Sequence, residues 1–168
     1  WFEVQDLGSQ IAAACAGDVH GARVLDYCAG GGGKTLALAA AMGNTRQLYA
    51  FDSDARRLAD TVRRGERAGV TNLDVRSPIV KNVLADLTGQ MDLVFVDAPC
   101  SGSGTWRRHP DAKWRLTDRQ LAVRMGEQEK VPLIATETYS TGLHMDALPK
   151  IKGTVVYKSP LMAPLKEG

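Results

Sequence analysis

The sequence predicts an α/β domain in which helices cover both faces of a mostly parallel β-sheet. Short apolar segments alternate with helix-like segments, an order that favours right-handed crossovers between parallel strands. A run of four glycines follows the first apolar segment, and an acidic residue follows the second. The chain has 168 residues, which suits one domain, 1–168, with a single core.

The first elements follow from apolar periodicity and from residues that end helices. Residues 7–20 place apolar side chains on one helix face, and residues 24–28 read as a short strand. The helix after the glycines, 34–42, ends where Gly43 and Asn44 suit a left-handed C-terminal cap. These residues therefore predict a strand, a glycine turn and a helix.

The next elements repeat this order. Residues 47–51 form an apolar strand, and Asp54 offers an N-cap for a helix over 54–68 that stops at Gly69. The remaining expectations are a third strand over 72–76, a helix over 79–88, a clear strand over 91–96 and a last strand over 153–157. The pattern weakens after about residue 130, where prolines interrupt regular structure.

Composition excludes several classes of protein. The apolar fraction of 44% and the charged fraction of 24% are ordinary for a globular protein, and no apolar run approaches a membrane span. No signal peptide is visible at the start, and the first residue is not Met, so we expect a fragment or a trimmed chain. The three cysteines are widely spaced, which predicts no metal site, no disulfide framework and a cytoplasmic setting.

The glycine turn and the acid after the second strand together indicate a bound nucleotide. The turn spans 30–33, and glycine permits a close approach of ligand to backbone at a helix N-terminus. Asp52 follows about twenty residues later, where a Rossmann unit places the carboxylate that binds ribose hydroxyls. The alternatives are a tight turn without a ligand for residues 30–33 and a helix N-cap for Asp52. A phosphate-binding P-loop does not match, because Cys28 occupies the position of its first glycine.

A second motif directly follows the clearest strand. It reads Asp97-Ala98-Pro99-Cys100-Ser101-Gly102-Ser103-Gly104. Because ligands of open α/β sheets bind beyond the carboxyl ends of strands, Asp97 and Cys100 should share an edge with the glycine turn. We interpret Cys100 as a functional thiol, since a loop beside proline and glycine is a poor place for a buried core cysteine.

A basic and aromatic cluster follows this motif. Residues 106–115 contain four Arg or Lys side chains, one His and two Trp. The net charge of the chain is only +2, so any attraction to nucleic acid must be local. A solvated loop anchored by its Trp side chains is the alternative.

Four stretches resemble the Sun/Fmu/Nop family of RNA cytosine-5 methyltransferases over about residues 1–128. Residues 4–10 look like its N-terminal motif, and residues 26–35 are similar to its cofactor loop, with Gly31 in place of the usual Pro. Asp52 falls at its ribose-binding acid, and residues 97–102 with 107–114 match its most specific signature.

The resemblance implies a Rossmann-like class I methyltransferase fold, S-adenosylmethionine as the methyl donor, and RNA, expected to be ribosomal, as the partner in rRNA processing. The residues expected to bind the cofactor are Cys28, Ala29, Gly30, Gly31, Gly32, Gly33, Lys34, Asp52 and Asp97. The residues expected to be catalytic are Cys100, Asp97 and Lys34. The residues expected to contact RNA are Arg107, Arg108, His109 and Lys113.

The sequence also departs from the family pattern. The family uses two cysteines: Cys100 matches the one that helps to release the product, whereas the nucleophile belongs to a motif after the fifth strand. No cysteine follows Cys100, and no clear acid follows the third strand. Truncation, a frameshift or a joined foreign segment would each explain an atypical tail over 130–168.

Three functions therefore remain open. The first is an RNA cytosine-5 methyltransferase domain. The second is a catalytically incomplete module that binds the cofactor and RNA. Because the second cysteine is missing, we expect that the chain does not complete 5-methylcytosine formation. The exception would be a chain in which Cys100 takes over the addition step. The third, an NAD-dependent oxidoreductase, shares the turn and the acid but does not explain the motif around Cys100.

Overall fold

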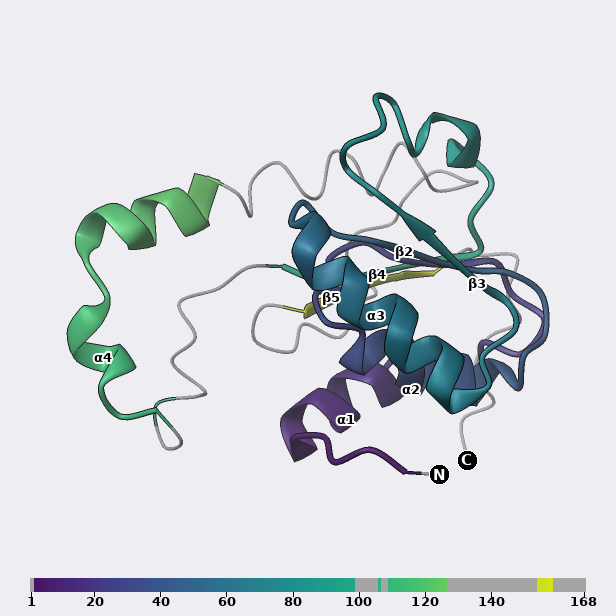
Figure 1. Cartoon of the computed structure of the whole chain (residues 1–168), viewed down its shortest axis with the longest axis horizontal. Helices are drawn as coiled ribbons and strands as arrows, with labels where there is room; N and C mark the ends of the chain where they lie inside the picture. The colour runs from purple at the N-terminus through teal and green to yellow at the C-terminus, as the bar shows by residue number, and fades with distance from the viewer. Residues whose placement is uncertain (1, 99–105, 107–108, 127–153, 159–168) are drawn as a thin grey trace.

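The computed structural model describes residues 2–98, 106, 109–126 and 154–158. Within them one sheet has the strand order β3-β2-β1-β4-β5 (Figure 1). The strands are β1 (Val24–Asp26), β2 (Leu48–Phe51), β3 (Leu73–Arg76), β4 (Leu93–Asp97) and β5 (Thr154–Lys158). Neighbours among β1 to β4 pair in parallel, whereas β5 is antiparallel to β4. The mostly parallel sheet predicted from the sequence is therefore confirmed.

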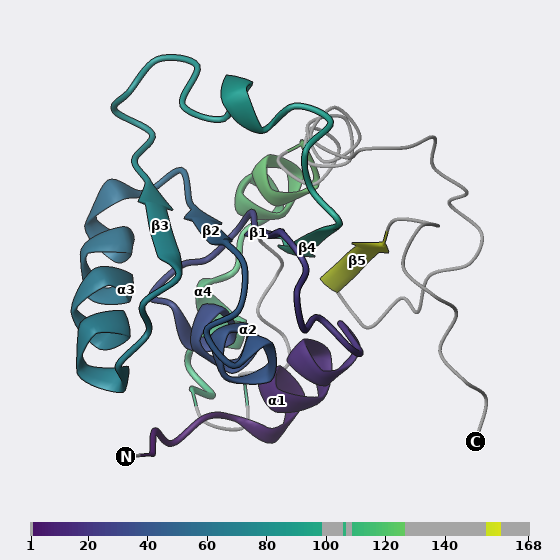
Figure 2. The same cartoon turned by 90° about the vertical axis from the view of Figure 1, so that its right-hand side faces the viewer.

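Three helices lie together on one side of this sheet, as Figures 1 and 2 show. They are α1 (Leu7–Ala14), α2 (Gly33–Met42) and α3 (Ala55–Ala68). The predicted caps are confirmed: Asp54 accepts a hydrogen bond from the Arg56 N–H at the start of α3, and Gly43 and Gly69 close α2 and α3 in the left-handed conformation.

Both faces of the sheet are buried, and alternate residues of a strand enter different cores. Val24 and Phe95 pack with the helix side chains of α1 and α2, whereas Leu25 and Val94 pack on the opposite face with Leu87. Such burial on both faces is typical of parallel sheets, whose strands read as nearly continuous apolar runs. The opposite face is covered by the connection between β3 and β4, which contains the short 3-10 helix η1 (Ala85–Leu87).

Two predicted helices and one predicted strand differ clearly from the structure, and other bounds shift by one or two residues, as for the strand expected over 91–96, which is Leu93–Asp97. The helix expected over 7–20 ends at Ala14, since Gly17 adopts the left-handed conformation. The strand expected over 24–28 ends at Asp26, because the glycine turn already begins at Tyr27. The helix expected over 79–88 is mostly turns around η1, and Asn82 within it has a positive φ of 56°. In both segments a left-handed residue, Gly17 or Asn82, interrupts helical hydrogen bonding.

The described elements between β4 and β5 lie beside the sheet. Figure 1 shows α4 (Ala112–Arg115) and the helical residues 118–126 apart from the β-strands. Their side chains are largely exposed. In the described part of the chain, no helix combines the length and the apolar character that a membrane crossing needs.

Candidate cofactor-binding site

The glycine turn joins β1 to α2 and requires glycine at two positions. Gly30 has a φ of 56° and Gly32 a φ of 84°, in the left-handed region that side chains disfavour. A Cβ atom on Gly32 would also lie 2.9 to 3.0 Å from atoms of Thr61 on α3. Backbone conformation and the close packing of α3 therefore both select glycine here.

The start of α2 presents polar backbone groups toward the turn. Gly32 is the N-cap of α2, and no side chain caps this end. The first N–H groups of the helix, at Gly33, Lys34 and Thr35, consequently have no partner within the helix. Such an end carries partial positive charge and attracts a carboxylate or a phosphate.

Asp52 connects the end of β2 to the glycine turn. Its Oδ2 accepts a hydrogen bond of 2.8 Å from the Gly30 N–H, and its Oδ1 accepts one of 2.8 Å from the Asp54 N–H. Arg57 Nη1 lies 3.7 Å from Oδ2. Asp52 is only 5% exposed, yet each carboxylate oxygen can accept a second hydrogen bond. The structure thus fixes this carboxylate against the turn, where ribose hydroxyls could reach it.

Lys34, at the start of α2, contacts Asp97, at the end of β4. The Lys34 Nζ donates to Asp97 Oδ2 at 2.5 Å, and both side chains are partly exposed. The contact follows from topology, because β4 lies directly beside β1 and runs parallel to it. The glycine turn, Asp52 and Asp97 therefore share one edge of the sheet, as the sequence predicted.

A buried carboxyl group lies beneath the turn. Asp26, at the end of β1, is 1% exposed, and its Oδ2 accepts a hydrogen bond of 2.7 Å from the hydroxyl of Thr35 on α2. Its Oδ1 is buried without a partner among the described residues. Burial raises the pKa of Asp26 to about 7, opposed by the Thr35 hydrogen bond. The carboxyl is consequently poised to gain or lose a proton near neutral pH.

The thiol of Cys28 is held in its protonated form. Burial, together with the negative charges of Asp26, Asp52 and Asp97, raises the pKa of Cys28 to about 12. Only the thiolate is a good nucleophile, so this environment makes Cys28 unsuited to attack a substrate. Cys15 is partly buried and packs against the core beside α1. Neither described cysteine is a nucleophile candidate.

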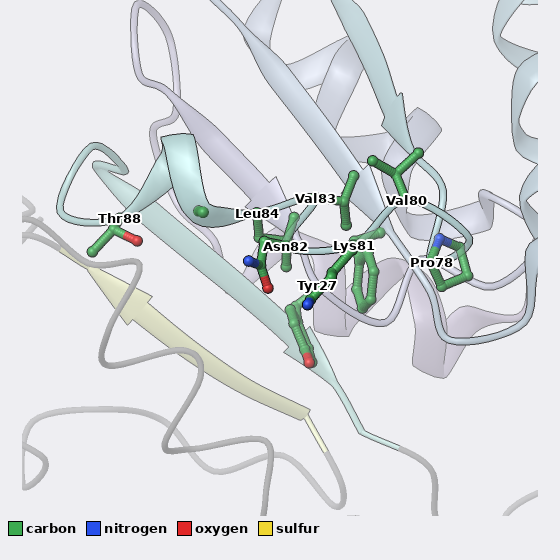
Figure 3. Close-up of a pocket in the computed structure, with 10 residues that line it drawn as sticks. Tyr27, Pro78, Val80, Lys81, Asn82, Val83, Leu84 and Thr88 are labelled. Atoms are coloured by element: carbon green, nitrogen blue, oxygen red, sulfur yellow. The ribbon is translucent and has the colours of Figure 1, made fainter.

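A cavity of about 510 Å³ opens next to the turn, on the sheet face opposite α1 to α3 (Figure 3). Tyr27 and Phe51, which directly precede Cys28 and Asp52, form one wall with ring centroids 5.1 Å apart. The connection after β3 forms the other wall, and its lining residues include Pro78, Val80 and Asn82. Two aromatic rings opposite a wall of mixed apolar and polar side chains suit a planar ring with a polar edge.

The structure brings together all nine predicted cofactor residues, but it does not describe all of the predicted catalytic and RNA-contacting residues. Residues 28–34, Asp52 and Asp97 lie around the turn. Cys100, Arg107 and Arg108 fall outside the described residues. His109 and Lys113 are exposed near α4, and Lys113 Nζ lies 5.0 Å from the ring centroid of Trp114.

Sequence reasoning missed the contribution of α3 to the turn. Thr61 donates its hydroxyl to the Gly30 carbonyl at 3.0 Å, and Arg64 donates to the Gly31 carbonyl. The residues Arg57, Thr61 and Arg64 follow the spacing of one helix face, but the burial of Thr61, which marks this face as the one against the turn, is seen only in the structure. The buried Asp26–Thr35 pair was also missed as part of the site.

The sheet order, the glycine turn and the acid after β2 define the Rossmann-like fold of class I methyltransferases. A solved methyltransferase homologue from Pyrococcus horikoshii is similar, with 30% identity and a TM-score of 0.62 over 78% of this chain and 40% of that one. NSun6 from the same organism has a similar fold, with 24% identity and a TM-score of 0.71 over 83% of this chain and 35% of that one.

Sequence comparison then gives the family. The family described as 16S rRNA methyltransferase RsmB/F matches residues 16–164, and the chain belongs to it. The ribosomal RNA small subunit methyltransferase B of Erwinia tasmaniensis is 36% identical over 78% of this chain and 30% of its own length. That of Salmonella paratyphi B is 34% identical over 98% of this chain and 36% of its own length. The chain thus spans about a third of these relatives.

Proposed function

We propose that this chain is the methyl-transferring domain of an S-adenosylmethionine-dependent enzyme that methylates C5 of cytosine in ribosomal RNA. The observation that carries the proposal is the juxtaposition of the Asp52-bound glycine turn with the Lys34–Asp97 pair. In this proposal the turn and Asp52 hold the cofactor, and the Lys34–Asp97 pair contacts the substrate at the same edge of the sheet. The family match and the methyltransferase names of the relatives support it.

The polar groups around the turn fit the amino-acid end of S-adenosylmethionine. Gln5 Nε2 is a buried donor without a described partner, and it lies 3.4 Å from the position of a Cβ on Gly33. Asp26 Oδ1 is a buried acceptor without a described partner. A carboxylate would pair with the Gln5 amide and the N–H groups that begin α2, and an ammonium group would pair with Asp26.

The nucleoside end of the cofactor fits the neighbouring features. Asp52 would accept hydrogen bonds from the ribose hydroxyls. The adenine ring would enter the adjacent cavity against Tyr27 and Phe51, where Asn82 offers an amide to its polar edge. When bound, the cofactor supplies an electrophilic methyl group.

The target cytosine meets Asp97, whose carboxylate would accept a hydrogen bond from the N4 amino group. Lys34 orients that carboxylate through their ion pair. C5 of cytosine is a poor nucleophile until a thiolate adds at C6, and removal of the C5 proton afterwards releases that thiolate. Since Cys28 is held protonated and Cys15 packs against the core, we assign the reacting thiol to Cys100.

A second candidate function is a module that binds cofactor and RNA without methylating. It is favoured by one observation, the absence of any cysteine after Cys100. In both cases Arg107, Arg108, His109 and Lys113 are proposed to contact the RNA, and a cytoplasmic setting belongs to the proposal.

The test combines calorimetry and methyl transfer. The chain is titrated with S-adenosylmethionine and then incubated with labelled cofactor and ribosomal RNA. Labelled 5-methylcytosine that disappears in Cys100→Ala supports the proposed enzyme and its thiol. Cofactor binding without any methyl transfer supports the non-catalytic module instead. Absence of cofactor binding contradicts both functions.

A further inference from the structure

The N-terminal segment is tied to the glycine turn through a side-chain relay on α3. Arg64 donates from Nη1 to the Gly31 carbonyl, and its Nε donates to Glu3 Oε2 at 2.9 Å. Its Nη2 forms an ion pair with the same Glu3 oxygen. One guanidinium group therefore bridges residue 3 and the centre of the turn, with its planar fork used on both sides.

This relay lies in a partly protected environment. The Arg64 and Glu3 side chains are 29% and 25% exposed. Charge-assisted hydrogen bonds in such a setting are stronger and more specific than those of a fully exposed pair. Thr61, one turn earlier on α3, holds the neighbouring Gly30 carbonyl, so two successive carbonyls of the turn are directed at α3. Fixing both carbonyls also fixes the peptide planes between them.

The same relay determines where the N-terminal segment lies. Glu3 is two residues before Gln5, whose amide nitrogen is buried against Gly33. Gln5 in turn is held by its carbonyl, which accepts a hydrogen bond of 2.8 Å from Gln10 Nε2 at α1. The segment is thus fastened at one end to α3 and at the other end to α1.

We propose that Arg64 and Glu3 are positioning residues that set the conformation of the glycine turn for S-adenosylmethionine. The proposal rests on the proposed function. Neither residue needs to touch the cofactor: Arg64 fixes the Gly31 peptide, and Glu3 orients Arg64 and fastens the segment that carries Gln5.

Arg67 provides a matched control. It also forms an ion pair with Glu3, through Oε1, but its described contacts do not include the turn. Arg64→Lys keeps the charge and loses the fork, and Glu3→Gln keeps the shape and loses the charge. Comparison of these variants with Arg67→Ala separates the geometry of the turn from the loss of an ion pair alone.

The experiment measures cofactor affinity by calorimetry and, without ligand, amide hydrogen exchange of residues 29–33 and the melting temperature. We expect Arg64→Lys and Glu3→Gln to weaken S-adenosylmethionine binding by about tenfold, the effect of one lost charge-assisted hydrogen bond. They should also speed exchange at Gly30 and Gly32, whose N–H groups donate to Asp52 and to the Ala29 carbonyl. Arg67→Ala should change neither quantity by more than about twofold, because an exposed ion pair alone contributes little.

Two results would overturn the proposal. One is unchanged exchange of the turn in Arg64→Lys and Arg64→Ala. The other is an equal effect of Arg67→Ala on the turn. If the wild-type chain binds no S-adenosylmethionine, the proposed function fails, but the exchange data still decide whether the relay sets the turn.

Discussion

At the scale of single residues, Asp52 combines two tasks. It accepts hydrogen bonds from the N–H groups of Gly30 and Asp54, and it is the proposed acceptor for the ribose hydroxyls. We predict that Asp52→Ala weakens S-adenosylmethionine binding by about 1–3 kcal/mol, the usual effect of losing hydrogen bonds to a charged group. Isothermal titration calorimetry measures this change.

A neighbouring acid supplies the control for Asp52. The Asp54 side chain caps α3 by accepting a hydrogen bond from the Arg56 N–H. Its other described contact is an exposed ion pair with the Arg56 side chain. Asp54→Ala should lower the free energy of unfolding by about 1 kcal/mol and leave cofactor affinity unchanged. Unchanged affinity in Asp52→Ala, or equal losses in both variants, would contradict the assignment of the ribose contact.

Asp26 makes stability depend on pH. Its pKa rises from an ordinary value of 3.8 to about 7 in the folded chain, chiefly through burial. Between these two values the folded chain keeps a proton that the unfolded chain has lost, so this group lowers the free energy of unfolding as pH rises from about 4 to about 7. Above pH 7 the full penalty of a buried charge applies.

The corresponding variant is Asp26→Asn, which keeps the shape and cannot ionise. We predict that it flattens the decrease in stability between pH 4 and pH 7 relative to the wild type. Urea unfolding at several pH values measures the effect. A variant whose stability falls with pH as steeply as that of the wild type would show that Asp26 is not the group responsible.

At the scale of elements, the glycine turn depends on its contact with α3. We predict that Gly32→Ala costs about 1–3 kcal/mol of stability and abolishes cofactor binding, because it adds a left-handed alanine that also collides with Thr61. Gly43→Ala is the control: this residue also has a positive φ, 59°, but a Cβ there meets no atom within 4 Å. Thermal unfolding and calorimetry should show a smaller stability loss and unchanged binding for Gly43→Ala.

The same elements show what the sequence could predict. The four parallel strands and α2 and α3 were predictable, since β1 and β4 are short buried apolar runs, β2 and β3 alternate with helical segments, and the caps leave Asp or Gly at fixed positions. The connection 79–88 was not, because Leu84 and Leu87 pack on the sheet from turns, and their spacing in the sequence resembles that of a helix.

The candidate site was predictable to a similar degree. The turn, Asp52 and Asp97 follow from their positions at strand ends. The Glu3–Arg64 relay could not be predicted, because it joins residues 61 positions apart, and nothing in local spacing shows which arginine of α3 faces the turn. The raised pKa of Cys28 could not be predicted either, because it depends on burial and on three neighbouring carboxylates that only the fold brings together.

At the scale of the whole molecule, the residues proposed to bind cofactor and substrate lie at one edge of the sheet, and the charge of the chain is nearly balanced. With a net charge of +2, the chain as a whole has little long-range attraction for RNA. The arginines of α3 add little to it, since each forms an ion pair with an acidic side chain. RNA binding should therefore depend on the local cluster over residues 106–115.

The balanced charge makes the contribution of this cluster measurable through the salt dependence of binding. Replacing both Arg107 and Arg108 with Ala should lower the affinity for ribosomal RNA and reduce the slope of log affinity against log salt by roughly 1–2, because each phosphate contact releases about one counterion. The control is Arg56→Ala with Arg63→Ala, which removes the same charge from the exposed face of α3. Affinity is measured by fluorescence anisotropy over a range of salt concentrations. Equal slopes for the wild type and Arg107→Ala/Arg108→Ala, or equal reductions in both double variants, would show that the cluster makes no specific phosphate contacts.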